Sequence, residues 1–347
     1  MANYADAALN SALYTMPDYM NRAEFKHKPS PVLMKYIQNT QFLIPATEME
    51  RALAVKNSDQ QTVKVNTLNK QSITTAAARA AAHTGSKNDS RVQTVSFTTT
   101  ASKFKYSIKS ADRNIWNLAQ IIQAQILSGS IAIHEAIETA LLARLNTKKT
   151  QVVVSATPRS GSWDGTNYIF QVDNADEDYF IQKAKGFMRE QYYKGVNYDA
   201  IVDEYLYQKY EVLANQGSAN ATNFGFQIAG VNPGVTQELT LDSGYVGMGY
   251  IFPIGSVGVV PWIPEKNRSG WGSSGENGGL YTSIPDPLGS GLRFAIHQYQ
   301  SGADNESNDG ETQDVDVQVE MSIDYGPVEA NSSTSNLSPI VKFGVLT

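Results

Sequence analysis

The spacing of apolar positions predicts one long helix in the first half of the chain. From about residue 111 to Lys149, apolar side chains recur at steps of three and four residues, the period of one helix face. They lie at Ile115, Leu118, Ile122, Ile126, Ile133, Ile137, Ala140 and Leu141. Ser110 or Asp112 is placed to cap its start. Roughly 35 residues at about 1.5 Å each give a rod of about 50 Å, far longer than the mean helix of about 11–12 residues.

Alternating apolar and polar positions predict a long β-hairpin before this helix. Residues 61–72 (QTVKVNTLNKQS) alternate weakly, and residues 91–108 (RVQTVSFTTTASKFKYSI) alternate again. An Ala-rich and then polar, turn-like segment separates the two runs. Because an isolated two-stranded ribbon is only marginally stable in water, we expect this ribbon to rest on another surface. A pair of edge strands packed on the body of the same chain is the plain alternative.

The first 58 residues show no regular period. Short apolar bursts are interrupted by Pro17, Pro29, Pro31 and Pro45. This pattern predicts an irregular arm that lies along other surfaces, with one short helix near residues 31–39.

Strands and helices alternate in the middle of the chain, which indicates an α/β piece. The expected elements are a strand at 150–157, an amphipathic helix capped by Asn174 or Asp176, a buried strand at 198–204 and a short helix closed by Gly217. Residues 218–291 are rich in Gly, Asn, Ser and Pro and predict loops with a few strands. Residues 292–299 and 315–325 are expected to pair, and residues 338–346 form a last strand. Together these elements predict an α+β fold.

The composition is that of a globular protein with few charges. The chain has 347 residues, of which 41% are hydrophobic and 18% charged, and this length suffices for two or three domains or subdomains. It contains no run of about 18 apolar residues, so we expect no membrane span. Its N-terminal segment lacks a basic start followed by an apolar core, so we expect no signal peptide. The absence of cysteine excludes disulfides, thiolate metal sites and cysteine nucleophiles.

Positive and negative charges separate along the sequence. Residues 1–150 hold 18 Lys and Arg against 10 Asp and Glu, and residues 151–347 hold 10 against 24, so the halves carry net charges of +8 and −14. Such asymmetry is typical of a chain with one half on nucleic acid, or of copies that place one half on the other half of a neighbour. A solvated surface without a partner is the plain alternative.

Motifs for catalysis and for cofactors or metals are weak or missing. His27, His83, His134 and His297 are far apart, and only His134 has an adjacent carboxylate, Glu135, which faces another side of the helix. We therefore expect no zinc site. The sequence contains no dinucleotide or P-loop fingerprint and no nucleophile elbow before a helix. These absences favour a protein with no cofactor and no enzymatic activity.

Two further patterns have ordinary structural explanations. Asn305, Ser307, Asp309, Gly310 and Asp316 approach the spacing of a calcium loop, but Asn and Asp replace the usual first and last ligands, so a solvated hairpin turn is favoured. A basic and aromatic run precedes the long helix and could stack nucleic-acid bases. It comprises Lys103, Phe104, Lys105, Tyr106, Ile108 and Lys109. A half-buried strand with outward lysines shows the same alternation and is the favoured interpretation.

The order of elements resembles the major capsid protein of tailed double-stranded-DNA bacteriophages, with the Hong Kong 97-like (Johnson) fold. Three segments carry the resemblance: VSFTTTASKFKYSIKSADRNIWNLAQIIQAQ, which continues to Lys149, then YDAIVDEYLYQKYEVLANQG, and then VDVQVEMSIDYGPVEANSS. In the family, these look like the extended loop with its spine helix, the entry to the axial lobe, and the closing strands of the peripheral lobe. The likeness covers most of the chain but is one of order and local pattern, without a diagnostic motif.

The resemblance implies a division of the chain into five segments. These are an N-terminal arm at 1–58, an extended hairpin loop at 59–104, a peripheral domain with the spine helix at 105–195, an axial domain at 196–291, and return strands to the peripheral domain at 292–347. The hairpin would reach over a neighbouring copy, through the basic residues Lys64, Lys70, Arg79, Lys87 and Arg91. Apolar side chains of both the hairpin and the arm would then be buried against neighbouring copies.

The resemblance also implies a function and partners. The expected function is a shell subunit that assembles as hexamers and pentamers into an icosahedral virion capsid around packaged DNA, bound by nonspecific phosphate contacts. The expected partners are other copies, a portal, and a scaffold or decoration protein, with assembly in the host cytoplasm and no membrane.

Two other functions are alternatives. An encapsulin-like nanocompartment shares this fold, and a fold does not by itself determine function. A carbohydrate-active enzyme using Trp163, Trp262 and Trp271 with Asp203 and Glu204 is a further alternative.

Overall fold

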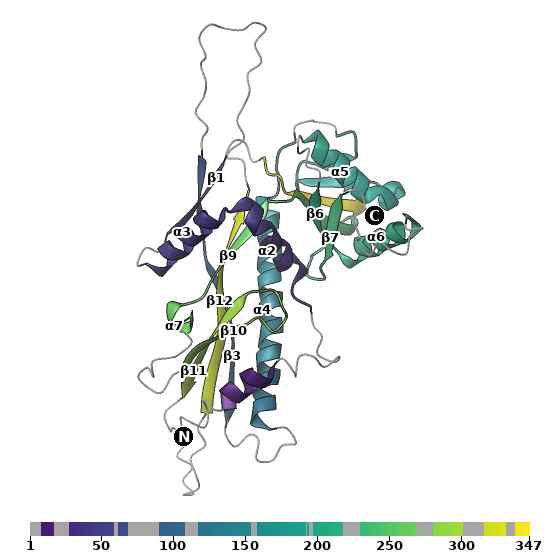
Figure 1. The fold of residues 1–347 in the computed structure, drawn as a ribbon. Helices are drawn as coiled ribbons and strands as arrows, with labels where there is room; N and C mark the ends of the chain where they lie inside the picture. Colours follow the sequence, from purple (N-terminus) through teal and green to yellow (C-terminus); the bar gives the residue numbers. More distant parts are fainter. Residues whose placement is uncertain are drawn as a thin grey trace, which may run out of the picture. The chain divides into compact units, whose positions relative to one another are not determined.

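The computed structural model separates into two compact units of mixed α and β structure (Figure 1). Unit 1 comprises Met1–Met34, Phe97–Leu141 and Pro261–Gly326, and unit 2 comprises Lys35–Ser96, Leu142–Val260 and Pro327–Thr347. The structure describes residues 8–16, 28–58, 62–68, 90–107, 117–153, 158–191, 193, 197–217, 230–268, 280–300, 316–330 and 337–347. The mixture of helices and sheets agrees with the predicted α+β class.

An antiparallel sheet forms the centre of unit 1. Its strands are β10 (Leu280–Pro285), β11 (Arg293–Gln300), β12 (Asp316–Glu329) and β3 (Thr98–Ser107), paired in that order, and β9 (Val257–Trp262) also pairs with β12. The predicted pairing of residues 292–299 with 315–325 is confirmed by the β11–β12 register. Along β12, Val319, Met321 and Ile323 are buried while Gln318 is exposed. The alternation gives this sheet one buried and one open face.

Helix α4 (Leu118–Lys148) is the predicted long helix and has 31 residues. In unit 1 it runs beside the sheet (Figure 1). A capping box starts it: the Gln120 backbone N–H donates to Asn117 Oδ1 (2.9 Å), and the Asn117 N–H donates to Gln120 Oε1 (3.2 Å). The caps expected at Ser110 and Asp112 lie outside the described residues.

By length and composition alone, α4 could cross a membrane, although no membrane span was expected from the sequence. However, 56% of its most apolar window is buried inside the protein. A core helix has this property, and the packing of α4 explains its apolar composition without a bilayer.

Gly129 lets α4 approach the sheet closely. A Cβ at this position would lie 2.8 Å from Ser102 Oγ and 3.0 Å from Met321 Cε. We predict that Gly129→Ala lowers the free energy of unfolding by about 1–2 kcal/mol, because overpacking outweighs the gain in helix propensity. Chemical denaturation measures this change in the free energy of unfolding. Gly165→Ala, where a Cβ would meet no atom within 4 Å, is the control. A loss at Gly129 that Ser102→Ala does not partly restore would contradict the steric explanation.

The prediction of an irregular N-terminal arm is wrong for the described part of residues 1–58, which is mostly helical. Residues 8–16 form a helix, α2 spans Pro31–Leu43 and α3 spans Ala46–Asn57. The helix expected near residues 31–39 is confirmed and continues to Leu43. Proline does not interrupt these helices, because Pro31 lies in the first turn of α2 and Pro45 precedes α3.

Strands β1 (Val63–Leu68) and β2 (Ser90–Val95) form an antiparallel two-stranded ribbon in unit 2, which is the base of the predicted hairpin. The predicted second arm at 91–108 is wrong in its extent. It breaks at Ser96 and Phe97, and the residues that follow form β3. β3 pairs with β12 over ten positions, so its alternation reflects burial in the sheet of unit 1.

The larger sheet of unit 2 has six strands in the order β4-β5-β13-β8-β6-β7. The pairs β13–β5 and β6–β7 are parallel, and the other pairs are antiparallel. The strands span Ser162–Asp164 (β4), Ile169–Val172 (β5), Val341–Leu346 (β13), Tyr245–Pro253 (β8), Tyr198–Val202 (β6) and Val231–Val235 (β7).

Helices α5 (Phe180–Glu190) and α6 (Glu204–Gly217) pack their apolar side chains on this sheet in one cluster. The predicted buried strand β6, the helix ending at Gly217 and the last strand β13 are confirmed. α5 begins later than expected, because the 3-10 helix η3 (Asn174–Tyr179) precedes it. Residues 151–153 are not a strand, and residues 154–157 lie outside the described part. The short α7 (Glu265–Arg268) belongs to unit 1.

Candidate assembly interface

The β1–β2 ribbon carries two of the five predicted contact residues. Lys64 lies on β1 and is exposed, and Arg91 lies on β2 opposite Thr67. Lys70, Arg79 and Lys87 lie outside the described residues. The structure therefore places Lys64 and Arg91 on one ribbon, at register positions on opposite faces. Contact with a neighbouring copy stays a prediction for all five residues.

One face of the ribbon is buried and the other is open. Val63 pairs with Val95, and both side chains are buried. On the other face, Lys64 and Val92 are exposed, and Val92 keeps 53% of its surface accessible. This face of the ribbon is therefore open to solvent in the described part of the chain.

Helix α3 supports the ribbon from within unit 2. Arg51 Nη2 donates to the Lys64 backbone oxygen (2.8 Å) and forms an ion pair with Glu48 (2.7 Å). The hydrogen bond to Arg51 lowers the pKa of the Glu48 carboxyl, and burial acts in the opposite direction. The pattern of residues 46–57 predicted no helix, so this support was not expected from the sequence.

Within unit 2, a buried carboxylate lies beside strand β2 of the ribbon. Gln93 Nε2 donates to the Glu329 backbone oxygen (2.7 Å), and Arg144 Nε lies 2.6 Å from Glu329 Oε1. The Glu329 side chain is only 2% exposed. Burial of the Arg144 guanidinium is the largest single influence and lowers its pKa, but the hydrogen bond to Glu329 and the negative charge of Glu329 act together to raise the pKa overall. Glu329 thus ties β2 to the end of α4.

A second buried network fixes α2 to the six-stranded sheet. Lys35 Nζ lies 2.9 Å from Asp199 Oδ1 and donates to the Asn232 backbone oxygen (3.0 Å). Asn39 Nδ2 donates to Asp199 Oδ2 (2.6 Å), and the Gly255 N–H donates to Asn39 Oδ1. The Lys35 and Asp199 side chains are 7% and 5% exposed. Since every polar group of this network has a partner, both charges are tolerated inside the protein.

Tyr36 gives a prediction with a matched control. Its hydroxyl is buried and has no hydrogen-bond partner among the described residues, and burial raises its pKa well above the ordinary value. We expect Tyr36→Phe to keep or increase the free energy of unfolding, by up to about 1 kcal/mol, because an unsatisfied group is removed. Tyr198→Phe removes a hydroxyl that donates to the Tyr193 oxygen, and should cost about 1 kcal/mol. Thermal denaturation compares the two variants, and a larger loss at Tyr36 would contradict the assignment.

Ser30, His134 and Asp286 meet inside unit 1, but they are not arranged for nucleophilic catalysis. His134 Nδ1 accepts the Ser30 backbone N–H (3.1 Å), and His134 Nε2 lies 2.8 Å from Asp286 Oδ2. Ser30 Oγ instead accepts the Leu33 N–H (3.2 Å) and caps α2. Burial opposes ionisation of Asp286, but the hydrogen bonds from His134 and Ser290 lower its pKa overall. This network anchors the start of α2, and no sequence motif indicated it.

Asp203, one of the two carboxylates considered for the carbohydrate-enzyme alternative, accepts backbone hydrogen bonds inside unit 2. Asp203 accepts the backbone N–H groups of Leu206 (2.9 Å) and Met248 (2.8 Å), so it caps α6. Burial raises the pKa of Asp203, and these two hydrogen bonds oppose the rise. No group of three or more His, Asp or Glu side chains in the described residues could hold a metal. Residues 305–310 of the calcium-like loop lie outside the described part.

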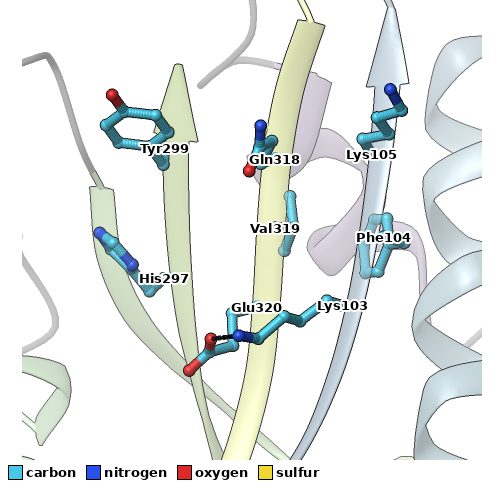
Figure 2. Close-up of a pocket in the computed structure, with 8 residues that line it drawn as sticks. All are labelled: Lys103, Phe104, Lys105, His297, Tyr299, Gln318, Val319 and Glu320. Carbon is cyan, nitrogen blue, oxygen red and sulfur yellow. Dashed lines mark ion pairs between the residues drawn. The ribbon is translucent and has the colours of Figure 1, made fainter. Parts of the chain in front are cut away.

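The open face of the unit 1 sheet has a shallow hollow of about 480 Å³ (Figure 2). Lys103 pairs with Glu320 across it (3.1 Å). Tyr106, the second aromatic residue of β3, is buried, whereas the alternating Lys103 and Lys105 are exposed. β3 therefore presents its lysines and Tyr106 on opposite faces, as the half-buried-strand interpretation predicted.

Comparison with solved structures finds proteins of bacteriophages. Phage capsid structures resemble this chain. The "Capsid structure of the Cyanophage P-SCSP1u" has a TM-score of 0.45 and 11% identity, covering 84% of this chain and 85% of that chain. The "Asymmetric unit of bacteriophage PhiM1 mature capsid" has a TM-score of 0.43 and 12% identity, covering 83% of each chain. A protein of Mycobacterium phage Adephagia has a TM-score of 0.49 and 12% identity, covering 93% and 91%. No protein-family model and no curated protein matches the sequence.

Proposed function

We propose that this chain is a major capsid protein with a Hong Kong 97-like fold. The β1–β2 ribbon is the observation that carries the proposal. It is paired with neither larger sheet, is supported by α3 on one face, and exposes Lys64 and Val92 on the other. The face that carries Lys64 and Val92 is open and is suited to contact with a neighbouring copy.

The proposed assembly places hexamers and pentamers in an icosahedral shell around packaged double-stranded DNA. The charge separation supports contact between copies, since the basic half of one chain complements the acidic half of another. DNA would be held by nonspecific contact with phosphates. The protein would reside in the virion capsid, after assembly in the host cytoplasm with a portal and with scaffold or decoration proteins.

Charge reversal on the ribbon tests the proposed contact. We expect Lys64→Glu combined with Arg91→Glu to slow assembly at least about ten-fold, because two attractions between copies become repulsions. Light scattering measures the rate, and wild-type assembly should also slow as salt is raised. The control is Lys148→Glu combined with Lys183→Glu, two half-exposed lysines outside the ribbon. Adding Arg79→Glu and Lys87→Glu extends the test to the rest of the predicted contact set. Unchanged assembly of the four-site variant would contradict the contact.

A further inference from the structure

A row of three side chains crosses the hollow on the open face of the unit 1 sheet. It runs from Tyr299 on β11 through Gln318 on β12 to Lys105 on β3 (Figure 2). These residues are partners in the strand register, with Tyr299 opposite Gln318 and Gln318 opposite Lys105. Since neighbouring strands lie about 4.8 Å apart, the two ends of the row are roughly 10 Å apart. The row thus offers an aromatic ring, an amide and an ammonium group in line.

A second row lies two residues away along the same strands, and it also has a ring at one end and an ammonium group at the other. It runs from His297 through Glu320 to Lys103 (Figure 2). The side chains of the Lys103–Glu320 ion pair (3.1 Å) are 74% and 38% exposed. Because water screens so exposed a pair, it is weak, and Lys103 can contact another anion. At about 3.4 Å per residue, the two rows are about 7 Å apart.

The His297 ring belongs to a stack that reaches the hollow. It lies against the Tyr281 ring on β10, with centroids 4.3 Å apart and planes 16° apart. Lys266 Nζ lies 5.5 Å from the centroid of the Tyr281 ring. Of these three residues only His297 lines the hollow, so a planar group in the hollow can extend the stack. Burial lowers the pKa of His297, the Glu320 charge opposes this decrease and the Lys266 charge adds to it, so the ring is uncharged at neutral pH.

The shape and chemistry of the hollow favour an extended anionic polymer. Sites for small molecules enclose most of the ligand surface, whereas this hollow is shallow and lies on an open sheet face. Proteins that bind single-stranded nucleic acid combine cationic side chains along the backbone with rings on which bases stack. The aromatic rings of a sheet face can hold two or three unpaired bases in this way. A duplex presents its phosphates but keeps its base faces covered, so the rings favour a single strand.

We propose that the open face of the unit 1 sheet binds single-stranded nucleic acid. One base stacks on Tyr299 and the next on His297, and the phosphates lie against Lys105 and Lys103. Gln318 lies between ring and ammonium group, and its amide can donate to and accept from a base edge or a sugar. This site is distinct from the nonspecific duplex contact of the proposed function. Shell formation does not depend on it, so the two proposals can fail separately.

Fluorescence anisotropy of a labelled oligodeoxythymidine mixed with the full chain tests the proposal. We expect Tyr299→Ala to weaken binding on the order of ten-fold, because one stacked base is lost. Tyr179→Ala is the matched control and should leave the affinity unchanged, since Tyr179 is a 57% exposed tyrosine in unit 2. Lys105→Gln should reduce the slope of log affinity against log salt by about 0.7, the value for one phosphate contact on a single strand. No binding, equal affinity of wild type and Tyr299→Ala, or equally tight binding of a duplex of the same length would overturn the proposal.

Photocrosslinking locates the bound strand without any substitution, so it also decides the question if Tyr299→Ala does not fold. The oligonucleotide then carries 5-bromouracil in place of thymine, which crosslinks on irradiation to aromatic rings that lie against it. Mass spectrometry of the digested full chain identifies the crosslinked peptides. We expect adducts on the β11 peptide that contains His297 and Tyr299. Adducts found only on other peptides would refute the assignment of this face.

Discussion

Lys35→Met should lower the free energy of unfolding by about 3–5 kcal/mol, because it leaves the Asp199 carboxylate buried without its cation. The two side chains are 7% and 5% exposed, so water cannot replace the lost partner. Methionine keeps the length and most of the apolar stem of lysine, so the loss reports mainly on charge. Urea denaturation followed by circular dichroism measures the change.

The same substitution at an exposed ion pair is the matched control. Lys183 lies 3.0 Å from Asp176, with side chains 32% and 42% exposed, and Lys183→Met should cost less than about 1 kcal/mol. Adding Asp199→Asn to Lys35→Met removes the stranded charge and should restore part of the stability. Equal losses at the two lysines would mean that the Lys35–Asp199 pair is hydrated in solution and that it does not fix α2 to the sheet.

Shortening the hairpin should abolish assembly while leaving the fold intact. In the proposed variant, residues 69–89 are replaced by Asn-Gly, so that a two-residue turn joins the paired residues Leu68 and Ser90. The β1–β2 pairing and the α3 contact are kept, and a shorter loop costs less entropy to close. The free energy of unfolding should therefore stay within about 0.5 kcal/mol of the wild-type value or rise.

Shell formation by this variant tests whether the hairpin contacts neighbouring copies. If the replaced residues contact neighbouring copies, the variant remains a folded monomer or small oligomer under conditions in which the wild type forms shells. A second variant keeps the wild-type length but has residues 69–89 in scrambled order. It shows whether assembly depends on the sequence of this segment or only on its length. Normal shells from the short variant would refute the assignment. A large loss of stability would mean that the segment packs on its own subunit.

The elements predicted correctly from the sequence are those with a strong, uninterrupted period. The apolar stripe of α4 continues through Gly129, so its 31 residues could be recognised without tertiary information. The fully buried β6 and the helix ending at Gly217 have similarly clear signals. In contrast, α3 has a single buried side chain, Ala52, so its sequence shows little amphipathic pattern. The prolines before α2 and α3 marked helix starts and were misinterpreted as interruptions.

The candidate interface could be predicted only in part. Alternation of polar and apolar residues located the ribbon and placed Lys64 and Arg91 on it, because both depend on local sequence. The break between β2 and β3 depends on which sheet each strand joins, and alternation alone does not distinguish sheets. The buried networks join residues far apart in the chain, such as Lys35 and Asp199, separated by 164 positions. No local pattern connects such a pair.

Electron microscopy of the negatively stained full chain, with light scattering on the same sample, shows whether the chain assembles into a shell. We expect closed shells, tubes, or rings of five and six subunits. Nucleic acid inside closed shells would favour the phage capsid over the nanocompartment. A compact monomer at high protein concentration, with the segment from residue 69 to 89 resistant to protease, would contradict a role as a shell subunit. In that case the ribbon would serve the fold of its own chain, and it would not link copies into a shell.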